Sequence, residues 1–330
     1  MILHNTVGKI TTAVLFSITV SLSSLDVRAT ELKMITSWGE NHSGTKHIAY
    51  RYRDMVKKMS GGKITITAFG PEVVPPGRQL QPTGGGVFDL IYTHGLYHTG
   101  DTAIGAALDA IDKDIEKRRN SGVWAWIDKY YSEKQNLKVL AIPTAHSGFR
   151  MLLKDPMPAD GKLSGMKIRA LPSWNGVVNN LGATPVVISF GELYSSVEKG
   201  VVDGLIWTGV GILNFKYHEV APHLINPVFG SVSYLLMMNL DRWNSFDPAE
   251  QKLLLDAGHE LEKSTVLTFN RLLREETAAM EAAGATQGHY VGLEQEELEQ
   301  LFVNQAMKLA VEYSGEDGVK FRDFVQAKGL

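Results

Sequence analysis

The chain has 330 residues, with 33 Lys and Arg, 36 Asp and Glu and no cysteine. Its net charge of −3 disfavours a nucleic-acid partner and an anionic membrane surface, because both attract proteins with a basic face. Without cysteine the chain has no thiol nucleophile and no disulfide, so its fold depends on the hydrophobic core, and its length suggests about two domains.

Residues 1–29 have the pattern of an export signal. Lys9 precedes an apolar run over 10–22, and Val-Arg-Ala at 27–29 resembles a signal-peptidase site. The run is short and interrupted by Ser and Thr, which suits a cleaved signal better than a membrane span. We therefore expect a periplasmic protein, cleaved near Ala29 and not embedded in the membrane. An uncleaved N-terminal anchor helix is the alternative.

The segment that follows alternates strands with helices. This rhythm predicts a mostly parallel sheet covered by helices, whose ligands bind beyond the carboxyl ends of the strands. That rule points to Trp38, Tyr92, His94 and the region of Pro143. The predicted strands are 31–36, 63–69, 88–93 and 137–142, with a helix over 43–60 that ends at Gly61-Gly62.

A second strand and helix pattern begins at Gly148 and predicts a second α/β lobe. Strands are expected at 149–153, 167–170, 184–188 and 202–207, with helices near 174–180 and 191–199. A further strand over 231–239 is expected to cross back to the first lobe. We assign 30–147 and about 236–275 to lobe I, and 148–235 and about 276–330 to lobe II. Lobes joined by strands suggest a hinge around a cleft.

The C-terminal part predicts long helices. Asp247-Pro248-Ala249-Glu250 has the form of a capping box with proline at the first helical position. The following helix could run towards Ala282, and apolar residues from Leu298 to Leu309 indicate a last helix. The predicted fold class is α/β, a two-lobed periplasmic binding protein fold with the ligand cleft between the lobes.

The sequence offers few candidates for catalysis or for a bound cofactor. The glycines at 84–86 precede a predicted strand instead of following one, and 209–211 lacks the third glycine of a dinucleotide fingerprint. No Gly-x-Ser-x-Gly elbow is present. We therefore predict a binding protein with no cofactor, although catalytic triads are scattered in sequence and their absence is weak evidence.

His94 and His98 have the spacing of two ligands on one face of a helix. They follow a predicted strand, with Gly95 between them and no glutamate beside His94, so the pattern disfavours a zinc site. We predict no metal ion. A structural role for His94 is the commonest outcome for such a residue, and a polar role in the cleft is the functional alternative.

Two arginines and several tryptophans are the strongest candidates for ligand binding. Arg150 lies in SGFRMLL and Arg169 in MKIRALP, both apolar runs without an adjacent acid. A buried guanidinium is costly unless it is paired, and its donors suit a carboxylate. A surface salt bridge is the alternative for each arginine. Trp38, Trp174 and Trp207 fall at predicted strand ends or loops, where core packing is their alternative role.

The order of these features resembles the periplasmic solute-binding subunit of tripartite ATP-independent periplasmic (TRAP) transporters, the DctP-like family. The motifs that carry the resemblance are SGFRMLL at 147–153, GMKIRALP at 165–172, LGATPV at 181–186 and GELYSSVEKGVVDG at 191–204. It implies a protein that closes around a small organic acid and delivers it to TRAP membrane subunits. It also implies that Arg169 binds the ligand carboxylate, that Arg150 adds a second contact and that Trp207 lines the pocket.

One pair of residues departs from the branches of this family. The branch that binds 2-oxo acids with a cation typically has Glu-Trp where this chain has Ile206-Trp207. A carboxylate ligand for a cation is therefore missing. The aromatic candidates Trp38, Tyr92, Trp174 and Trp207 favour a compact, partly apolar carboxylate over a large sugar acid.

Two rival functions remain open from the sequence. An exported hydrolase or isomerase acting on a small acid would need a base in the cleft, with His94 the first suspect. A receptor subunit that feeds a signalling partner would share the same binding cleft.

Overall fold

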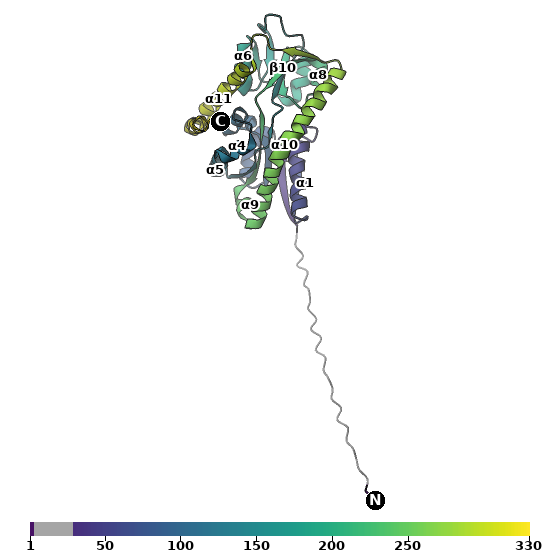
Figure 1. Cartoon of the computed structure of the whole chain (residues 1–330), viewed down its shortest axis with the longest axis vertical. Helices are drawn as coiled ribbons and strands as arrows, with labels where there is room; N and C mark the ends of the chain where they lie inside the picture. Colours follow the sequence, from purple (N-terminus) through teal and green to yellow (C-terminus); the bar gives the residue numbers. More distant parts are fainter. Residues whose placement is uncertain (3–28) are drawn as a thin grey trace.

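The computed structural model describes residues 1–2 and 29–330, and the greater part of the predicted signal, 3–28, lies outside the described residues. Two sheets follow one another along the long axis of the molecule, each accompanied by helices (Figure 1). In the described part of the chain, no helix is both long and apolar enough to cross a bilayer. The predicted two-lobed α/β fold class is confirmed.

The first sheet has the strand order β2-β1-β3-β11-β4, with the short β5 pairing β11. Strand β11 runs antiparallel to its neighbours, and the other long strands are parallel to one another. The sheet is thus mostly parallel, as the sequence predicts. Its strands are β1 (Thr30–Thr36), β2 (Ile64–Phe69), β3 (Leu90–His94), β4 (Leu137–Ala141), β5 (Thr144–Ala145) and β11 (Val232–Asn239).

Helices cover this sheet, and the helix predicted over 43–60 consists of two parts. A π-helical turn over Thr45–Ala49 leads into α1 (Tyr50–Met59), which Gly61 and Gly62 end with positive φ angles of 61° and 82°. The other helices of this part are α2 (Leu80–Gly84), α3 (Ile104–Ala107), α4 (Ile115–Asn120), α5 (Val123–Gln135) and α9 (Leu240–Asn244), with 3-10 turns at Pro76–Arg78, Gly95–His98 and Leu108–Ala110.

The second sheet has the order β12-β10-β6-β9-β7-β8, and β6 is its antiparallel strand. Strands β10 and β12 extend the sheet beyond the strands that the sequence predicts. The elements are β6 (Phe149–Leu153), β7 (Lys167–Arg169), β8 (Thr184–Val186), β9 (Gly204–Thr208), β10 (His223–Phe229) and β12 (Thr286–His289), with helices α6 (Asn175–Asn180), α7 (Leu193–Glu198) and α8 (Tyr217–Val220) and 3-10 turns at Pro172–Trp174 and Phe190–Glu192.

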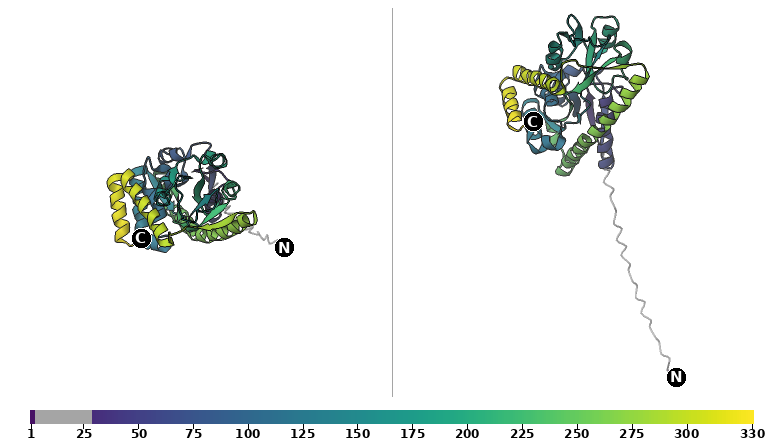
Figure 2. Two further views of the ribbon diagram at one scale, coloured as in Figure 1. Left: turned by 90° about the horizontal axis from the view of Figure 1, so that it is seen from above. Right: turned by 45° about the horizontal axis from the view of Figure 1, so that its top comes forward.

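Two long helices complete the chain. Helix α10 (Pro248–Ala282) starts at the predicted capping box, where Asp247 accepts the N–H of Glu250 and the Glu250 side chain accepts the N–H of Asp247. It runs beside both sheets (Figure 1). Helix α11 (Gln295–Ala327) breaks at Gly315, which has φ 53° and ψ −127°. Figure 2 shows its two limbs (yellow) across the molecule from α10 (green).

The chain crosses between the sheets where β5 leads to β6 and where β10 leads to β11. The boundary predicted near 235/236 falls inside β11, whose first residues Val232 and Ser233 already pair with β5 in the first sheet. Helix α11 contacts α3 on one side and α6 on the other. The assignment of residues to lobes stays a prediction, with the crossover best placed before Val232.

Candidate ligand-binding site

A small pocket of about 40 Å³ lies between the two sheets. Trp38 follows β1 and His94 ends β3 on one side, while Arg169 ends β7 and Trp207 lies in β9 on the other. The site is therefore built where strands of both sheets end, as expected for α/β proteins. The full lining is Trp38, His42, His94, Leu96, Tyr97, Phe149, Arg169, Leu171, Trp174, Trp207, Thr208, Val232 and Tyr234.

Arg169 is the charged centre of this pocket. It is 4% exposed, and its Nε and Nη1 donate to the backbone oxygens of Ile188 at 3.4 Å and Ile206 at 3.2 Å. No carboxylate among the residues that the structure describes forms a salt bridge with it. Its guanidinium carbon lies 5.7 Å from the ring centre of Trp174 and 5.5 Å from that of Trp207. Burial lowers the pKa of Arg169 from its usual value, opposed by Tyr97 and Tyr217.

Aromatic side chains form the walls of the pocket. Trp38 stacks on His42 with ring centres 4.5 Å apart and planes 9° apart, and its Nε1 donates to Tyr97 Oη at 3.1 Å. On the opposite side Trp207 stacks against Phe190 at 5.7 Å. The pocket thus combines one cation with flat apolar surfaces, which suits an anion with an apolar body.

His42 supplies a neutral polar group to the same pocket. Its Nδ1 accepts the backbone N–H of Gly44 at 3.1 Å, which leaves the proton on Nε2. Burial, reinforced by the nearby His94, lowers the pKa of His42 to about 3. The imidazole is therefore uncharged at neutral pH and presents a hydrogen-bond donor.

His94 has both ring nitrogens engaged. Nδ1 accepts the N–H of Leu96 at 3.2 Å, and Nε2 lies 3.0 Å from Oδ2 of the buried Asp109. Asp109 also accepts the N–H of Ser233 at 2.7 Å. No lone pair of His94 is left for a general base, so this geometry disfavours the rival hydrolase or isomerase that would use it.

His98 and His94 do not share a ligand-binding geometry. His98 Nε2 lies 2.7 Å from Thr93 Oγ1, and burial lowers the pKa of His98 to about 3. Within residues 1–2 and 29–330 no group of three or more His, Cys, Asp or Glu side chains could hold a metal ion. The prediction that the protein binds no metal stays a prediction.

The structure brings Trp38, His94, Arg169, Trp174 and Trp207 together, but it does not bring Tyr92 and Arg150 into the pocket lining. Tyr92 lies behind the wall, where its ring stacks on Tyr234 at 5.4 Å.

The side chains of Arg150 and its neighbour Phe149 in β6 point to opposite faces of the second sheet. Arg150 lies opposite Trp207 in the β6–β9 pair and so shares a face with Trp207 and Arg169, but it does not belong to the pocket lining. Its Nη1 lies 3.4 Å from Thr277 Oγ1 of α10. Burial lowers the pKa of Arg150, and Glu276 opposes this effect. The second arginine contact implied by the family resemblance stays a prediction.

Eight lining residues escaped the sequence analysis, and four of them have ring side chains: His42, Tyr97, Phe149 and Tyr234. The first two lie in segments just after predicted strands, so the strand-end rule could have found them. Phe149 and Tyr234 lie within strands, and which face of a strand meets a cleft depends on the packing of the two sheets. No local signal marks them.

The segments that follow β1 and β9 also contact each other outside the pocket lining. Asn214 Nδ2 donates to Asn41 O at 2.9 Å and to Ser43 Oγ at 3.3 Å. The segment that carries Asn214 is held to α10, because Glu276 accepts the N–H groups of Gly211 and Leu213, with shortest distances of 2.7 Å. We call the hydrogen bonds of Asn214 to Asn41 and Ser43 the interlobe contact. They join the segment after β1 to the segment after β9.

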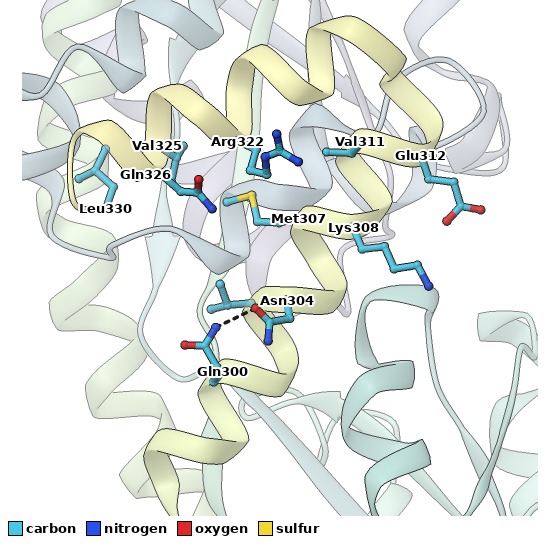
Figure 3. A pocket seen from close by; sticks show the side chains of 11 residues that line it. Gln300, Asn304, Met307, Lys308, Val311, Glu312, Arg322, Val325, Gln326 and Leu330 are labelled. Carbon is cyan, nitrogen blue, oxygen red and sulfur yellow. Dashed lines mark hydrogen bonds between the residues drawn. The ribbon is translucent and has the colours of Figure 1, made fainter.

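A larger groove of about 870 Å³ lies on the outside of the molecule between the limbs of α11 (Figure 3). Its polar groups do not converge on one point: Gln300 pairs with Asn304 at 2.8 Å, and Lys308 and Glu312 extend away from Arg322. Ligand sites are concave and have converging polar groups. The small interlobe pocket is therefore the better candidate.

A two-lobed α/β fold with a pocket between its two sheets is the architecture of solute-binding proteins. The family model of DctP, described as bacterial extracellular solute-binding protein, family 7, matches residues 35–314. The chain belongs to this family, as the resemblance of its motifs indicates.

Relatives and solved structures agree with this assignment. The chain is 24% identical over 268 residues to a monocarboxylate 2-oxoacid-binding periplasmic protein of Nostoc sp., covering 76% of this chain and 71% of the relative. It is 28% identical over 156 residues to the C4-dicarboxylate-binding periplasmic protein DctP of Rhodobacter capsulatus, covering 45% of this chain and 46% of the relative. The chain thus aligns with less than half of some relatives.

The fold matches nearly complete solved structures. A TRAP periplasmic solute-binding protein from Desulfovibrio salexigens with bound orotic acid gives a TM-score of 0.76 at 16% identity, covering 90% of this chain and 98% of that one. A Bordetella pertussis extracytoplasmic solute receptor that binds pyroglutamic acid gives a TM-score of 0.74 at 15% identity, covering 90% of this chain and 100% of that one.

Proposed function

We propose that this chain is a periplasmic solute-binding protein that captures a small organic carboxylate by closing its lobes and delivers it to the membrane subunits of a TRAP-type transporter. The observation that carries the proposal is Arg169, a buried guanidinium between two aromatic rings with no carboxylate partner in the described part of the chain. An unpaired buried charge is unfavourable, and an external anion would compensate it.

The relatives support the chemical class of this ligand. Orotate, pyroglutamate and 2-acetolactate occupy structures of the same fold, and each is a small carboxylic acid. The Nostoc and Rhodobacter proteins are named as binding monocarboxylic and dicarboxylic acids. For the present chain we infer export through the N-terminal signal with cleavage near Ala29, no enzymatic activity and no nucleic-acid partner.

Replacing Arg169 with alanine tests the ligand assignment. We expect Arg169→Ala to weaken carboxylate binding at least tenfold, about 1.4 kcal/mol, because a charge-assisted hydrogen bond contributes about 1.5–3 kcal/mol. Orotate, pyroglutamate, picolinate and 2-oxobutanoate are screened by thermal shift, and the best binder is titrated by calorimetry.

Arg322→Ala is the matched control, since Arg322 is a partly exposed arginine of α11 paired with Asp323. Equal affinity of the Arg169→Ala variant and the wild type would refute the assignment. Recovery of a chemically altered acid after incubation would favour an enzyme, and genes for signalling proteins beside this one would favour a receptor.

A further inference from the structure

We infer that Glu276 of α10 is a positioning residue of the ligand pocket. Its carboxylate holds the segment 209–215, which follows β9 and which we call the anchored segment, so that Trp207 stays in the pocket wall and Asn214 reaches the segment after β1. Glu276 itself does not belong to the pocket lining. The inference rests on the proposed function, because its rate measurements need a bound acid, but it can fail while the role of Arg169 stands.

The anchored segment presents two backbone N–H groups to the carboxylate of Glu276. The nitrogen of Gly211 lies 2.7 Å from Oε2 and 3.0 Å from Oε1, and that of Leu213 lies 2.7 Å from Oε1. Gly211 has φ 104°, a conformation that favours glycine, and it turns the chain so that both N–H groups face α10. Converging backbone N–H groups form an anion-binding concavity, and hydrogen bonds to an ionised carboxylate are roughly twice as strong as neutral ones.

Two further backbone hydrogen bonds tie the anchored segment to its own lobe. Gly209 donates its N–H to Gly148 O at 2.8 Å, and Tyr217 of α8 donates its N–H to Ile212 O at 3.1 Å. The N–H groups of Gly211 and Leu213, between these ties, use Glu276 as their acceptor. The carboxylate therefore decides where the middle of the segment lies relative to α10.

The anchored segment joins the pocket wall to the interlobe contact. Phe215 packs edge-on against Trp207, with ring centres 5.7 Å apart and planes at 76°, and its ring centre lies 6.5 Å from that of His42. Both Trp207 and His42 line the pocket. In the same segment Asn214 donates to Asn41 O and to Ser43 Oγ. A displacement of this segment would thus disturb one wall of the pocket and the interlobe contact together.

The negative charge of Glu276 is the property that the anchored segment binds. Burial raises the pKa of Glu276, and the N–H groups of the segment, those of Gly211, Leu213 and Ile212, oppose this effect, as does Arg150. A glutamine of the same size would place an NH2 group, which only donates, where one carboxylate oxygen now accepts. Glu276→Gln therefore removes the anchor while it keeps the volume of the side chain.

Hydrogen exchange of the unliganded protein, followed by mass spectrometry, tests the anchor directly. We expect amides in 209–215 to exchange at least tenfold faster in Glu276→Gln than in the wild type, because the carboxylate no longer protects them. Glu275→Gln is the matched control, since Glu275 is exposed and pairs with Arg271 at 2.7 Å, and it should exchange as the wild type does. Unchanged exchange in Glu276→Gln would overturn the inference.

The effect on the pocket is measured by stopped-flow fluorescence with the tightest acid from the thermal-shift screen. We expect Glu276→Gln to accelerate ligand dissociation at least fivefold and to change the association rate less than twofold. In Glu276→Gln/Asn214→Ala the acceleration should be smaller than the product of the two single effects, because both residues act through the anchored segment. An unchanged dissociation rate, or the full product, would overturn the inference. Binding that still required Arg169 would leave the proposed function in place.

Glu276→Asp separates charge from packing. It keeps the carboxylate but shortens its reach, so its dissociation rate should lie between those of the wild type and Glu276→Gln. Dissociation as fast as in Glu276→Gln would show that the length of the side chain, and not its charge, holds the segment, and this would overturn the inference. If Glu276→Gln does not fold, Glu276→Asp carries the test, with at least a twofold acceleration expected and an unchanged rate overturning the inference.

Discussion

Two buried histidines make the stability of the protein depend on pH. Burial lowers the pKa of His42 and of His98 to about 3 from 6.5. The unfolded chain therefore takes up protons near pH 6.5 that the folded chain takes up only near pH 3. The free energy of unfolding falls as the pH drops below 6.5, and the full contribution is present above that value.

At pH 5.5, one unit below the pKa in the unfolded chain, we expect each of these histidines to lower the free energy of unfolding by about 1.4 kcal/mol. Urea unfolding at pH 7.5 and pH 5.5 measures the difference. The double variant His42→Gln/His98→Gln serves as the control and should show a smaller loss between the two values. A wild-type protein that is as stable at pH 5.5 as at pH 7.5 would contradict the neutral, buried state of both rings.

Single residues also show what the sequence could predict about the site. Arg169 could be predicted as a ligand-binding residue because a lone arginine at the end of an apolar strand implies an unpaired charge. This argument does not depend on how the strand pairs with its neighbours. Arg150 has the same local pattern and shares the sheet face of Arg169, but it lies outside the pocket lining, with Nη1 near Thr277 of α10. No local signal encodes that packing. The neutral form of His42 depends on burial by Trp38 and on Gly44, and both follow from the tertiary fold.

At the scale of the elements, α10 contains a glycine, Gly258, at which alanine should destabilise the protein, although alanine usually stabilises helices. Gly258 packs so closely on β4 that an added Cβ would overlap Leu140 O. At an exposed helix position Gly→Ala stabilises by about 1 kcal/mol. We expect Gly258→Ala to destabilise by about 1–3 kcal/mol instead, because the strand backbone cannot move without disturbing the sheet.

Chemical unfolding measures this effect. Gly191→Ala is the control, since an added Cβ there meets no atom within 4 Å. A Gly258→Ala variant at least as stable as the wild type would show that α10 does not press on β4.

Elements with strong periodicity were predictable and those set by long-range pairing were not. The long strands of the first sheet and the start of α10 follow from alternation, apolar runs and the capping box, whereas the short β5 was not predicted. Strand β10 escaped because it contains Pro227 and changes register between Ile225 and Phe229. Strand β12 has the polar sequence TQGH and exists only because β10 offers it an edge.

At the scale of the whole molecule, the interlobe contact should control how fast the ligand leaves. Asn214→Ala removes hydrogen bonds that join the two sides of the closed pocket, each worth about 1 kcal/mol. We expect ligand dissociation to accelerate about fivefold or more, with a smaller change in the association rate. Stopped-flow fluorescence with the tightest acid from the thermal-shift screen can follow the pocket tryptophans.

Asn180→Ala, at an exposed end of α6, is the matched control. Solution scattering adds a second readout, since the unliganded variant should be more extended than the unliganded wild type. Identical dissociation rates and identical scattering profiles would mean that Asn214 does not hold the lobes together.

The repeated crossing of the chain between its two halves has a consequence for the thermodynamics of capture. Two bodies joined by one flexible linker must lose a wide range of mutual orientations when they enclose a solute. Here the connections after β5 and before β11, together with α10, which bonds to Tyr52 near one end and to the segment beyond β9 near the other, restrict that range in advance. Capture then has a smaller entropic cost, and more of the interaction with the solute appears as affinity.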